Sequence, residues 1–198
     1  MKDIKKTVVP EIHLANRSTF IKWAGRTILR ISGWKVEGEI PNLNKFVLVG
    51  GPHTSNWDFV FALGLIWSLD LKMYVLAKAS LFKIPILKKL MYGVGGIPVN
   101  RNNPKLIVDK VSQLIKEEGG VIIGITPEGT RSKVDKWKTG FLRIAKQMDC
   151  KIVSIAIDFE KKSMFFNGFF EPSGDNDQDI KDLKSFYSGF KAKHPKNF

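Results

Sequence analysis

Short apolar runs alternate with longer stretches of helical length along the chain, which predicts an α/β fold. The runs with the length of strands are residues 34–40, 46–49, 73–77, 95–99, 121–125, 152–157 and 163–170. The stretches with the length of helices are residues 17–34, 59–69, 104–118, 139–148 and 180–193. Run 121–125 is continuously apolar, as in a central buried strand, whereas 163–170 is expected at an edge. We therefore predict a single domain with a mixed, largely buried sheet flanked by helices.

The first predicted helix, residues 17–34, is amphipathic. One face carries apolar or small side chains, namely Phe20, Ala24, Thr27 and Ile31 with Trp23 and Ile28 beside them, and the other carries Lys22, Arg26 and Arg30. This pattern suits a helix that lies in the lipid headgroup layer. It suits equally well a helix that packs on the domain and turns a basic face to solvent.

Residues 81–90 form a second stretch with a mixed surface. Apolar side chains alternate irregularly with three lysines, and Pro85 interrupts the segment. The composition fits a surface element that dips into lipid, and it also fits a partly buried helix.

Composition narrows the choice of partners. The formal net charge is +13, which favours an anionic partner such as nucleic acid, anionic lipid or an acidic carrier or substrate, although a basic surface can also serve solubility alone. Stacking aromatics interleaved with basic residues are not evident, so no nucleic acid is expected. The single cysteine, Cys150, excludes an intramolecular disulfide and a multi-cysteine metal site.

Two hydropathy features bear on location. The segment before residue 10 has no apolar core of the kind found in secretory signals, so none is expected. The longest uncharged run, residues 46–57, is too short and too interrupted by glycine and proline to span a bilayer. We expect a protein that does not cross a membrane by itself.

A histidine and a carboxylate flank the start of the predicted helix at 59–69. His53 and Asp58 are five positions apart, so they would not meet within a regular helix or strand. They can meet at a helix N-terminus where Thr54, Ser55 or Asn56 caps the helix and Asp58 lies in its first turn. Asp58 would then orient the His53 ring and leave its other nitrogen free as a base. A capped helix with an uninvolved histidine is the alternative.

Two further strand ends carry polar residues. Arg101 follows the 95–99 run, and Glu128, Gly129, Thr130, Arg131 and Ser132 follow the 121–125 run. Ligand sites in α/β sheets gather at such strand ends. Gly129 allows a tight turn whose N–H groups can hold an anion, Arg131 offers a planar fork for phosphate, and Thr130 and Ser132 add hydroxyls. Each of these residues alone is more often structural. His13 and His194, near the two termini, are not expected in a site.

Four motifs occur in the order and spacing of the glycerolipid acyltransferase family. They are His53-x4-Asp58, Gly96 to Arg101, Pro127 to Ser132 and the run 152–157. Together they cover about residues 45–160, and we note that the chain resembles this family, which includes the bacterial 1-acylglycerol-3-phosphate acyltransferases. The family often has Asn where Pro52 stands and usually has Pro where Ser154 stands. The resemblance implies a glycerol-3-phosphate acyltransferase-like fold.

The resemblance also implies a reaction. His53, oriented by Asp58, would take the proton from a lysolipid hydroxyl, which attacks the thioester of acyl-CoA or acyl-carrier protein. Arg101 and Arg131 would hold the acceptor's phosphate with the Gly129–Thr130 backbone and Ser132. Glu128 would bond the acceptor or order Arg131. Neither a metal nor another cofactor is required. The leading acceptor is lysophosphatidic acid, giving phosphatidic acid, and lyso forms of amino-acid lipids are the main alternative.

These inferences predict how the chain is organised. Residues 1–36 would be an amphipathic membrane-surface segment and residues 37–198 the acyltransferase domain. The protein would be peripheral, on the cytoplasmic face of an anionic membrane. A catalytically silent basic protein that binds lipid on the same fold is the alternative from a different class.

Overall fold

The structure is a computed structural model, and it describes residues 7–99 and 104–198. Its α-helices are α1 Thr19–Ser32, α2 Asn56–Ser68, α3 Pro85–Gly93, α4 Pro104–Glu118, α5 Gly140–Gln147 and α6 Asn176–Ser188. Its strands are β1 Lys35–Glu37, β2 Lys45–Gly51, β3 Tyr74–Lys78, β4 Gly96–Val99, β5 Val121–Ile125, β6 Lys151–Asp158 and β7 Ser163–Phe170. Three short 3-10 helices complete the described elements: η1 Glu11–His13, η2 Ala79–Lys83 and η3 Pro195–Asn197.

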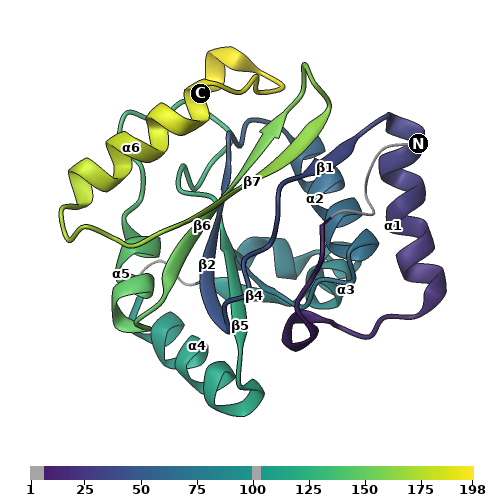
Figure 1. Ribbon diagram of the computed structural model, residues 1–198, viewed down its shortest axis with the longest axis horizontal. Coiled ribbons are helices and arrows are strands. Elements are labelled where there is room, and N and C mark those ends of the chain that lie inside the picture. The colour runs from purple at the N-terminus through teal and green to yellow at the C-terminus, as the bar shows by residue number, and fades with distance from the viewer. Residues whose placement is uncertain (1–6, 100–103) are drawn as a thin grey trace.

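The strands of the described residues form a 7-stranded sheet in the order β1-β7-β6-β2-β5-β3-β4 (Figure 1). Strands β6, β2, β5, β3 and β4 are parallel to one another. β7 is antiparallel to β6, and β1 is parallel to β7. The sheet is therefore mixed, as predicted, and the carboxyl ends of its five parallel strands meet at one edge.

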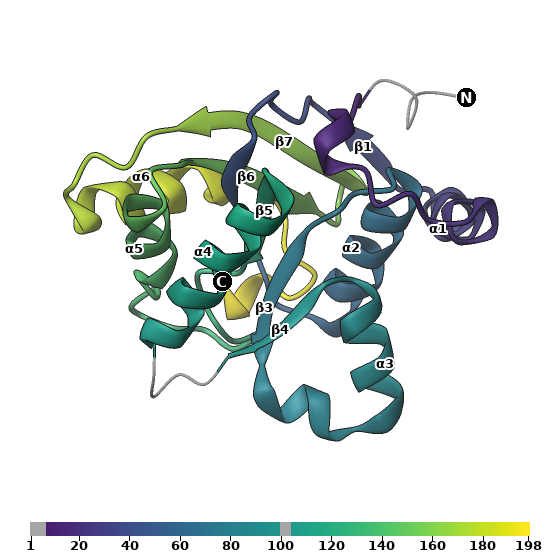
Figure 2. The same cartoon turned by 90° about the horizontal axis from the view of Figure 1, so that it is seen from below.

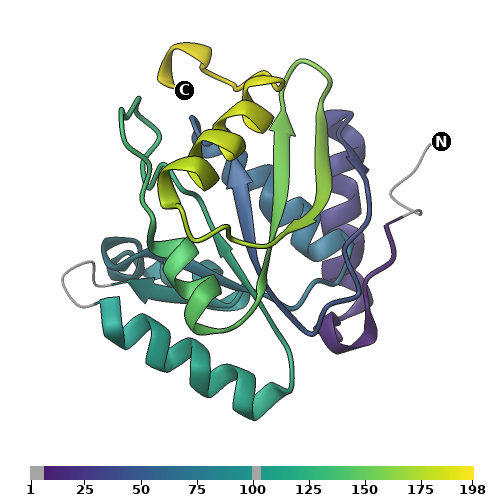
Figure 3. The same ribbon diagram turned by 60° about the vertical axis from the view of Figure 1, so that its left-hand side comes forward.

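Helices cover both faces of the sheet, and the alternation of side chains along β2 shows why. Phe46 and Leu48 point into the core beneath α1 and α2, and Val47 and Val49 point into the core beneath α4, α5 and α6. Figure 2 shows these two layers of helices on opposite sides of the strands, and Figure 3 brings α4, α5 and α6 toward the viewer. A strand that is buried on both faces has a continuous run of apolar residues, and β2 has such a run at residues 46–49.

The position of β7 corrects one prediction. The 163–170 strand was expected at an edge, but β7 lies between β1 and β6. β1 pairs with its outer side through Lys35↔Ser163, Val36↔Met164 and Glu37↔Phe165. Because β1 has only three residues, its sequence carries too little pattern to predict this pairing.

Helix α1 packs on α2 through small side chains. A Cβ atom on Gly25 would lie 2.5 Å from the Ser68 backbone nitrogen, and one on Gly64 would lie 3.0 Å from Leu29 Cδ2. Gly25 and Leu29 are the buried residues of α1. Three large side chains of the predicted apolar face point away from the domain: Phe20 is 71% exposed, Trp23 57% and Ile31 83%. The helix thus contacts the domain mainly along another side, and Ile28, at the border of the predicted face, is half-buried next to Gly64.

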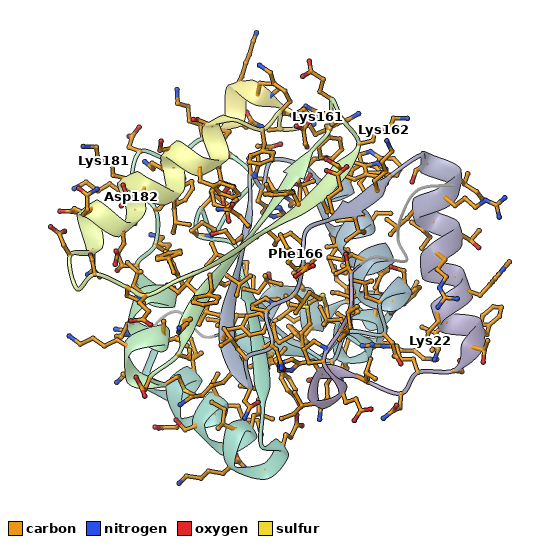
Figure 4. All side chains as sticks on the ribbon, viewed as in Figure 1. Lys22, Lys161, Lys162, Phe166, Lys181 and Asp182 are labelled. Atoms are coloured by element: carbon orange, nitrogen blue, oxygen red, sulfur yellow. The ribbon has the colours of Figure 1, made fainter. Side chains whose placement is uncertain are left out.

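Basic groups flank the exposed face of α1. Lys22 lies near the lower end of the helix in Figure 4, where its Nζ is 3.7 Å from Asp70 Oδ2. Arg26 and Arg30 are exposed further along. Lys161 and Lys162 lie at the turn between β6 and β7 (Figure 4). Within the described residues, no helix has the length and apolarity needed to cross a membrane.

Candidate active site

The first turn of α2 holds the Asp58 carboxylate in a fixed position near the carboxyl end of β2. Ser55 is the N-cap residue, and its Oγ accepts a hydrogen bond from the Trp57 N–H. Asp58, at the third position of the helix, reaches back so that its Oδ2 accepts from the Thr54 N–H at 2.7 Å and the Ser55 N–H at 2.8 Å. This is a capping box, in which the cap and the side chain three residues later satisfy each other's backbone groups. The predicted helix start is confirmed, with Ser55 as the cap.

The same carboxylate holds the His53 ring. His53 Nδ1 lies 3.0 Å from Asp58 Oδ2, and the Asp58 side chain is only 2% exposed. Two backbone N–H groups hold the carboxylate in place, so the carboxylate can in turn orient the ring. With Nδ1 facing Asp58, Nε2 is on the opposite side of an imidazole that is 23% exposed. The geometry thus orients one nitrogen of His53 toward the carboxylate and directs the other away from it.

Glu128 ties the loop after β5 to the loop after β2. Its Oε1 accepts a hydrogen bond from the His53 backbone N–H at 2.9 Å. The contact follows from the sheet, because β2 and β5 are neighbours with Val49 opposite Ile125. Burial raises the pKa of the Glu128 carboxyl to about 7, against the smaller lowering effect of the His53 N–H. Sequence reasoning placed Glu128 in the site and did not predict that it holds the histidine's backbone.

The rest of the loop after β5 is a tight turn open to solvent. Gly129 has φ +65°, which favours glycine, and its N–H donates to the Thr126 carbonyl at 3.1 Å. Thr130, Arg131 and Ser132 are exposed beyond it. Their hydroxyl and guanidinium groups are therefore accessible to a ligand at the edge where His53 lies. Arg101, the remaining predicted anion-binding residue, falls outside the described residues.

Two distant residues support the loop that carries His53, and the sequence pattern predicted neither contact. The Tyr187 hydroxyl of α6 donates to the Val49 carbonyl at 2.6 Å, and its ring packs 3.3 Å from where a Cβ of Gly51 would lie. The backbone N–H of His194 donates to Thr54 Oγ1 at 3.1 Å. His194 therefore meets the site through its backbone, a contact that no side-chain pattern can signal. His13, by contrast, is fully buried, with Nε2 2.7 Å from the Leu43 carbonyl oxygen.

The model of the family described as Acyltransferase matches residues 34–158, well over half of the chain. The chain belongs to the Acyltransferase family. The match contains the whole of β2, α2 and β5, and with them His53, Asp58 and Glu128. Membership confirms the resemblance inferred from the motifs.

Two known proteins resemble the chain. The 1-acyl-sn-glycerol-3-phosphate acyltransferase LPAT1 of Arabidopsis thaliana chloroplasts is 27% identical over 143 residues. The match covers 68% of this chain and 38% of that protein, so the chain spans well under half of that relative. The crystal structure of PlsC from Thermotoga maritima, a 1-acyl-sn-glycerophosphate acyltransferase, has a TM-score of 0.61 at 20% identity. That match covers 88% of this chain and 80% of PlsC, and it confirms the predicted acyltransferase fold.

Proposed function

We propose that this protein transfers a fatty acyl group to the free hydroxyl of lysophosphatidic acid, giving phosphatidic acid. The observation that carries the proposal is the His53–Asp58 contact of 3.0 Å at the edge of an acyltransferase-family sheet. Both relatives are named as 1-acyl-glycerol-phosphate acyltransferases, which supports the choice of acceptor.

The chemistry needs one base and one thioester. His53 Nε2 takes the proton of the acceptor hydroxyl while that oxygen attacks the thioester carbonyl carbon. When the tetrahedral intermediate collapses, the carbon–sulfur bond breaks and the imidazolium returns its proton to the leaving thiolate. Asp58 stabilises the imidazolium that exists between these two steps. The donor is acyl-CoA or acyl-carrier protein, and no metal or other cofactor enters the scheme.

The exposed loop after β5 supplies the anion site in this proposal. Arg131 pairs with the acceptor phosphate, and Thr130, Ser132 and the Gly129 turn add hydrogen bonds. Arg101, at the end of the neighbouring 95–99 segment, is proposed as the second cation. Glu128 acts indirectly, because it accepts a hydrogen bond from the His53 N–H and so fixes the position of the loop that carries His53.

Replacing His53 by Ala tests the base. Turnover should fall by about 10²- to 10⁴-fold, the usual contribution of a general base, while folding and vesicle binding stay near wild type. His194→Ala is the matched control. His194 contacts the loop that carries His53 through its backbone N–H, which the substitution retains. The assay is mass spectrometry of the product formed from lysophosphatidic acid with each thioester donor. A His53→Ala enzyme with wild-type turnover would remove the assignment.

Replacing Arg131 by Ala tests the phosphate site. The acceptor KM should rise, by about tenfold for one lost charge-assisted contact, with a smaller change in the KM for the donor. Lys133→Ala, an exposed cation on the same loop, is the control. An unchanged KM for a phosphate-bearing acceptor would contradict the role of Arg131.

We further propose that the enzyme is a peripheral protein of an anionic membrane, on its cytoplasmic face. The support is α1, whose Phe20, Trp23 and Ile31 side chains point away from the domain while its basic residues flank them. Changing Trp23 and Ile31 together to Ser should reduce sedimentation with anionic vesicles. Undiminished sedimentation of the double variant would count against α1 as the contact.

A further inference from the structure

The segment from Ala79 to Gly93, formed by η2 and α3, stands out from the sheet. Figure 2 shows it at the lower right, beneath β3 and β4. Four of its apolar or aromatic side chains face outward: Leu81 is 36% exposed, Ile84 49%, Ile86 81% and Tyr92 55%. Among the described residues of the two helices, only Met91 is buried. The segment therefore contributes little to the core, and its apolar side chains need another explanation.

The charged side chains of this segment are all positive. No acidic residue occurs between Asp70 and Asp109 in the sequence. Lysines are exposed throughout, at positions Lys78, Lys83, Lys88 and Lys89. Apolar side chains set among cations, with no carboxylate between them, match the combination that an anionic lipid surface attracts.

A second copy of the chain fits this surface less well. In a symmetric dimer the same patch would face itself, which would bring the lysines of one copy against those of the other. No carboxylate of the segment could pair with them. A lipid surface, by contrast, supplies negative headgroups to the lysines and acyl chains to the isoleucines at the same time.

We propose that the η2–α3 segment, Ala79–Gly93, is a second lipid-contacting element, which inserts Ile84 and Ile86 between the headgroups of an anionic bilayer. It rests on the proposed membrane function and adds a contact distinct from α1. The segment begins at the carboxyl end of β3, the same edge of the sheet that carries His53. Contact there brings the open edge of the active site to the bilayer that holds the acceptor.

A dye placed on the segment reports insertion directly. Ile86→Cys, labelled with an environment-sensitive fluorophore, should show a blue-shifted emission on vesicles that contain phosphatidylglycerol. Ser185→Cys, exposed on α6, is the matched control and should show no shift. Both variants are made in a Cys150→Ala background, so that the dye labels one position. The Cys150 thiol would in any case react poorly with the dye, because burial raises its pKa to about 11.

Two unlabelled variants separate the apolar and the electrostatic contributions. Ile86→Glu should weaken vesicle binding by about tenfold, and it should fold normally because a glutamate in the first turn of α3 suits the helix dipole. Ser185→Glu carries the same charge change and should bind as wild type. Changing Lys83, Lys88 and Lys89 together to Gln should weaken binding to anionic vesicles by on the order of 100-fold.

The outcomes distinguish this proposal from the proposed reaction, because vesicle binding is measured without substrate. A label on Ile86→Cys that stays in water while the protein sediments with vesicles would overturn the second contact and leave acyl transfer intact. A blue shift that appears without lipid as protein concentration rises would assign the surface to a second copy, and would also overturn it. Loss of turnover in His53→Ala with normal insertion would support both.

Discussion

A single oxygen atom, Asp58 Oδ2, organises the loop that carries His53. It accepts from the Thr54 and Ser55 N–H groups and lies 3.0 Å from His53 Nδ1. The first two contacts are those of an ordinary helix cap, and the third joins the cap to the ring of the proposed base. Helix formation and the orientation of the histidine are thus coupled, since α2 cannot begin in this way without placing the carboxylate under the ring.

Glu128 is the residue whose ionisation should affect the stability of the protein. Burial raises its pKa from 4.5 to about 7 in the folded state, so the folded protein holds this proton more tightly than the unfolded chain. The stabilisation is complete below about pH 4.5 and is lost as the pH rises toward 7. Glu128→Gln keeps an oxygen for the His53 N–H and cannot ionise. Its free energy of unfolding should therefore exceed that of the wild type at pH 8 by up to about 3 kcal/mol.

Urea denaturation at pH 5 and at pH 8 checks this difference. Glu160→Gln, which changes an exposed carboxyl, should follow the wild-type profile. Parallel profiles for the wild type and Glu128→Gln would contradict the raised pKa.

The candidate site was predictable where its contacts are local. His53 and Asp58 meet within one capping box, and the pattern Thr54, Ser55, Asn56, Asp58 marks a helix start. The bond between Glu128 and the His53 N–H joins residues 75 positions apart, and that from His194 to Thr54 joins residues 140 apart. Such contacts depend on which strands become neighbours, which no local pattern encodes.

At the scale of elements, the pairing of α1 with α2 decides how the apolar face of α1 is used. Because Gly25 and Gly64 let the two helices approach closely, the contact needs few large side chains, and Phe20, Trp23 and Ile31 remain outside. The apolar pattern predicted the helix correctly. It could not show which side packs on the domain, because two glycines leave almost no hydrophobic signal.

Gly25→Ala tests this close contact. Alanine in a helix interior is usually about 1 kcal/mol more stable than glycine. Here the new Cβ would lie 2.5 Å from the Ser68 nitrogen and 2.6 Å from Trp67 Cβ, so we expect a loss of about 1–3 kcal/mol instead. Gly140→Ala, whose Cβ would meet nothing within 4 Å, should cause no loss. Equal free energies of unfolding for the two variants, measured in urea, would argue against close packing of α1 on α2.

The strands show the same division between local and distant information. The runs at 121–125 and 152–157 were predicted nearly to the residue, since β5 and β6 are buried on both faces. The position of β7 was predicted wrongly because a three-residue partner, β1, covers its outer side. The local sequence pattern therefore predicted the strands, whereas their order in the sheet depends on packing between distant segments.

Over the whole molecule, charge and exposed apolar groups would act on different steps of the proposed membrane binding. The net charge of +13 would attract the protein to anionic lipid over a distance set by the ionic strength, whereas the apolar side chains of α1 and α3 would act only on contact. Raising the salt from about 0.1 M to 1 M shortens the screening length from about 10 Å to about 3 Å. Binding to phosphatidylglycerol vesicles should therefore weaken steeply over this range.

Neutral phosphatidylcholine vesicles provide the comparison, because only the apolar contacts act there. Binding to them should be weaker at low salt and nearly independent of it, and sedimentation across a salt series measures both. An identical salt response on the two lipids would mean that the positive charge does not steer the protein to the membrane. The distinction bears on function, since lysophosphatidic acid is itself an anionic lipid. A surface that concentrates the protein on negative bilayers brings the His53 edge to membranes that contain the proposed acceptor.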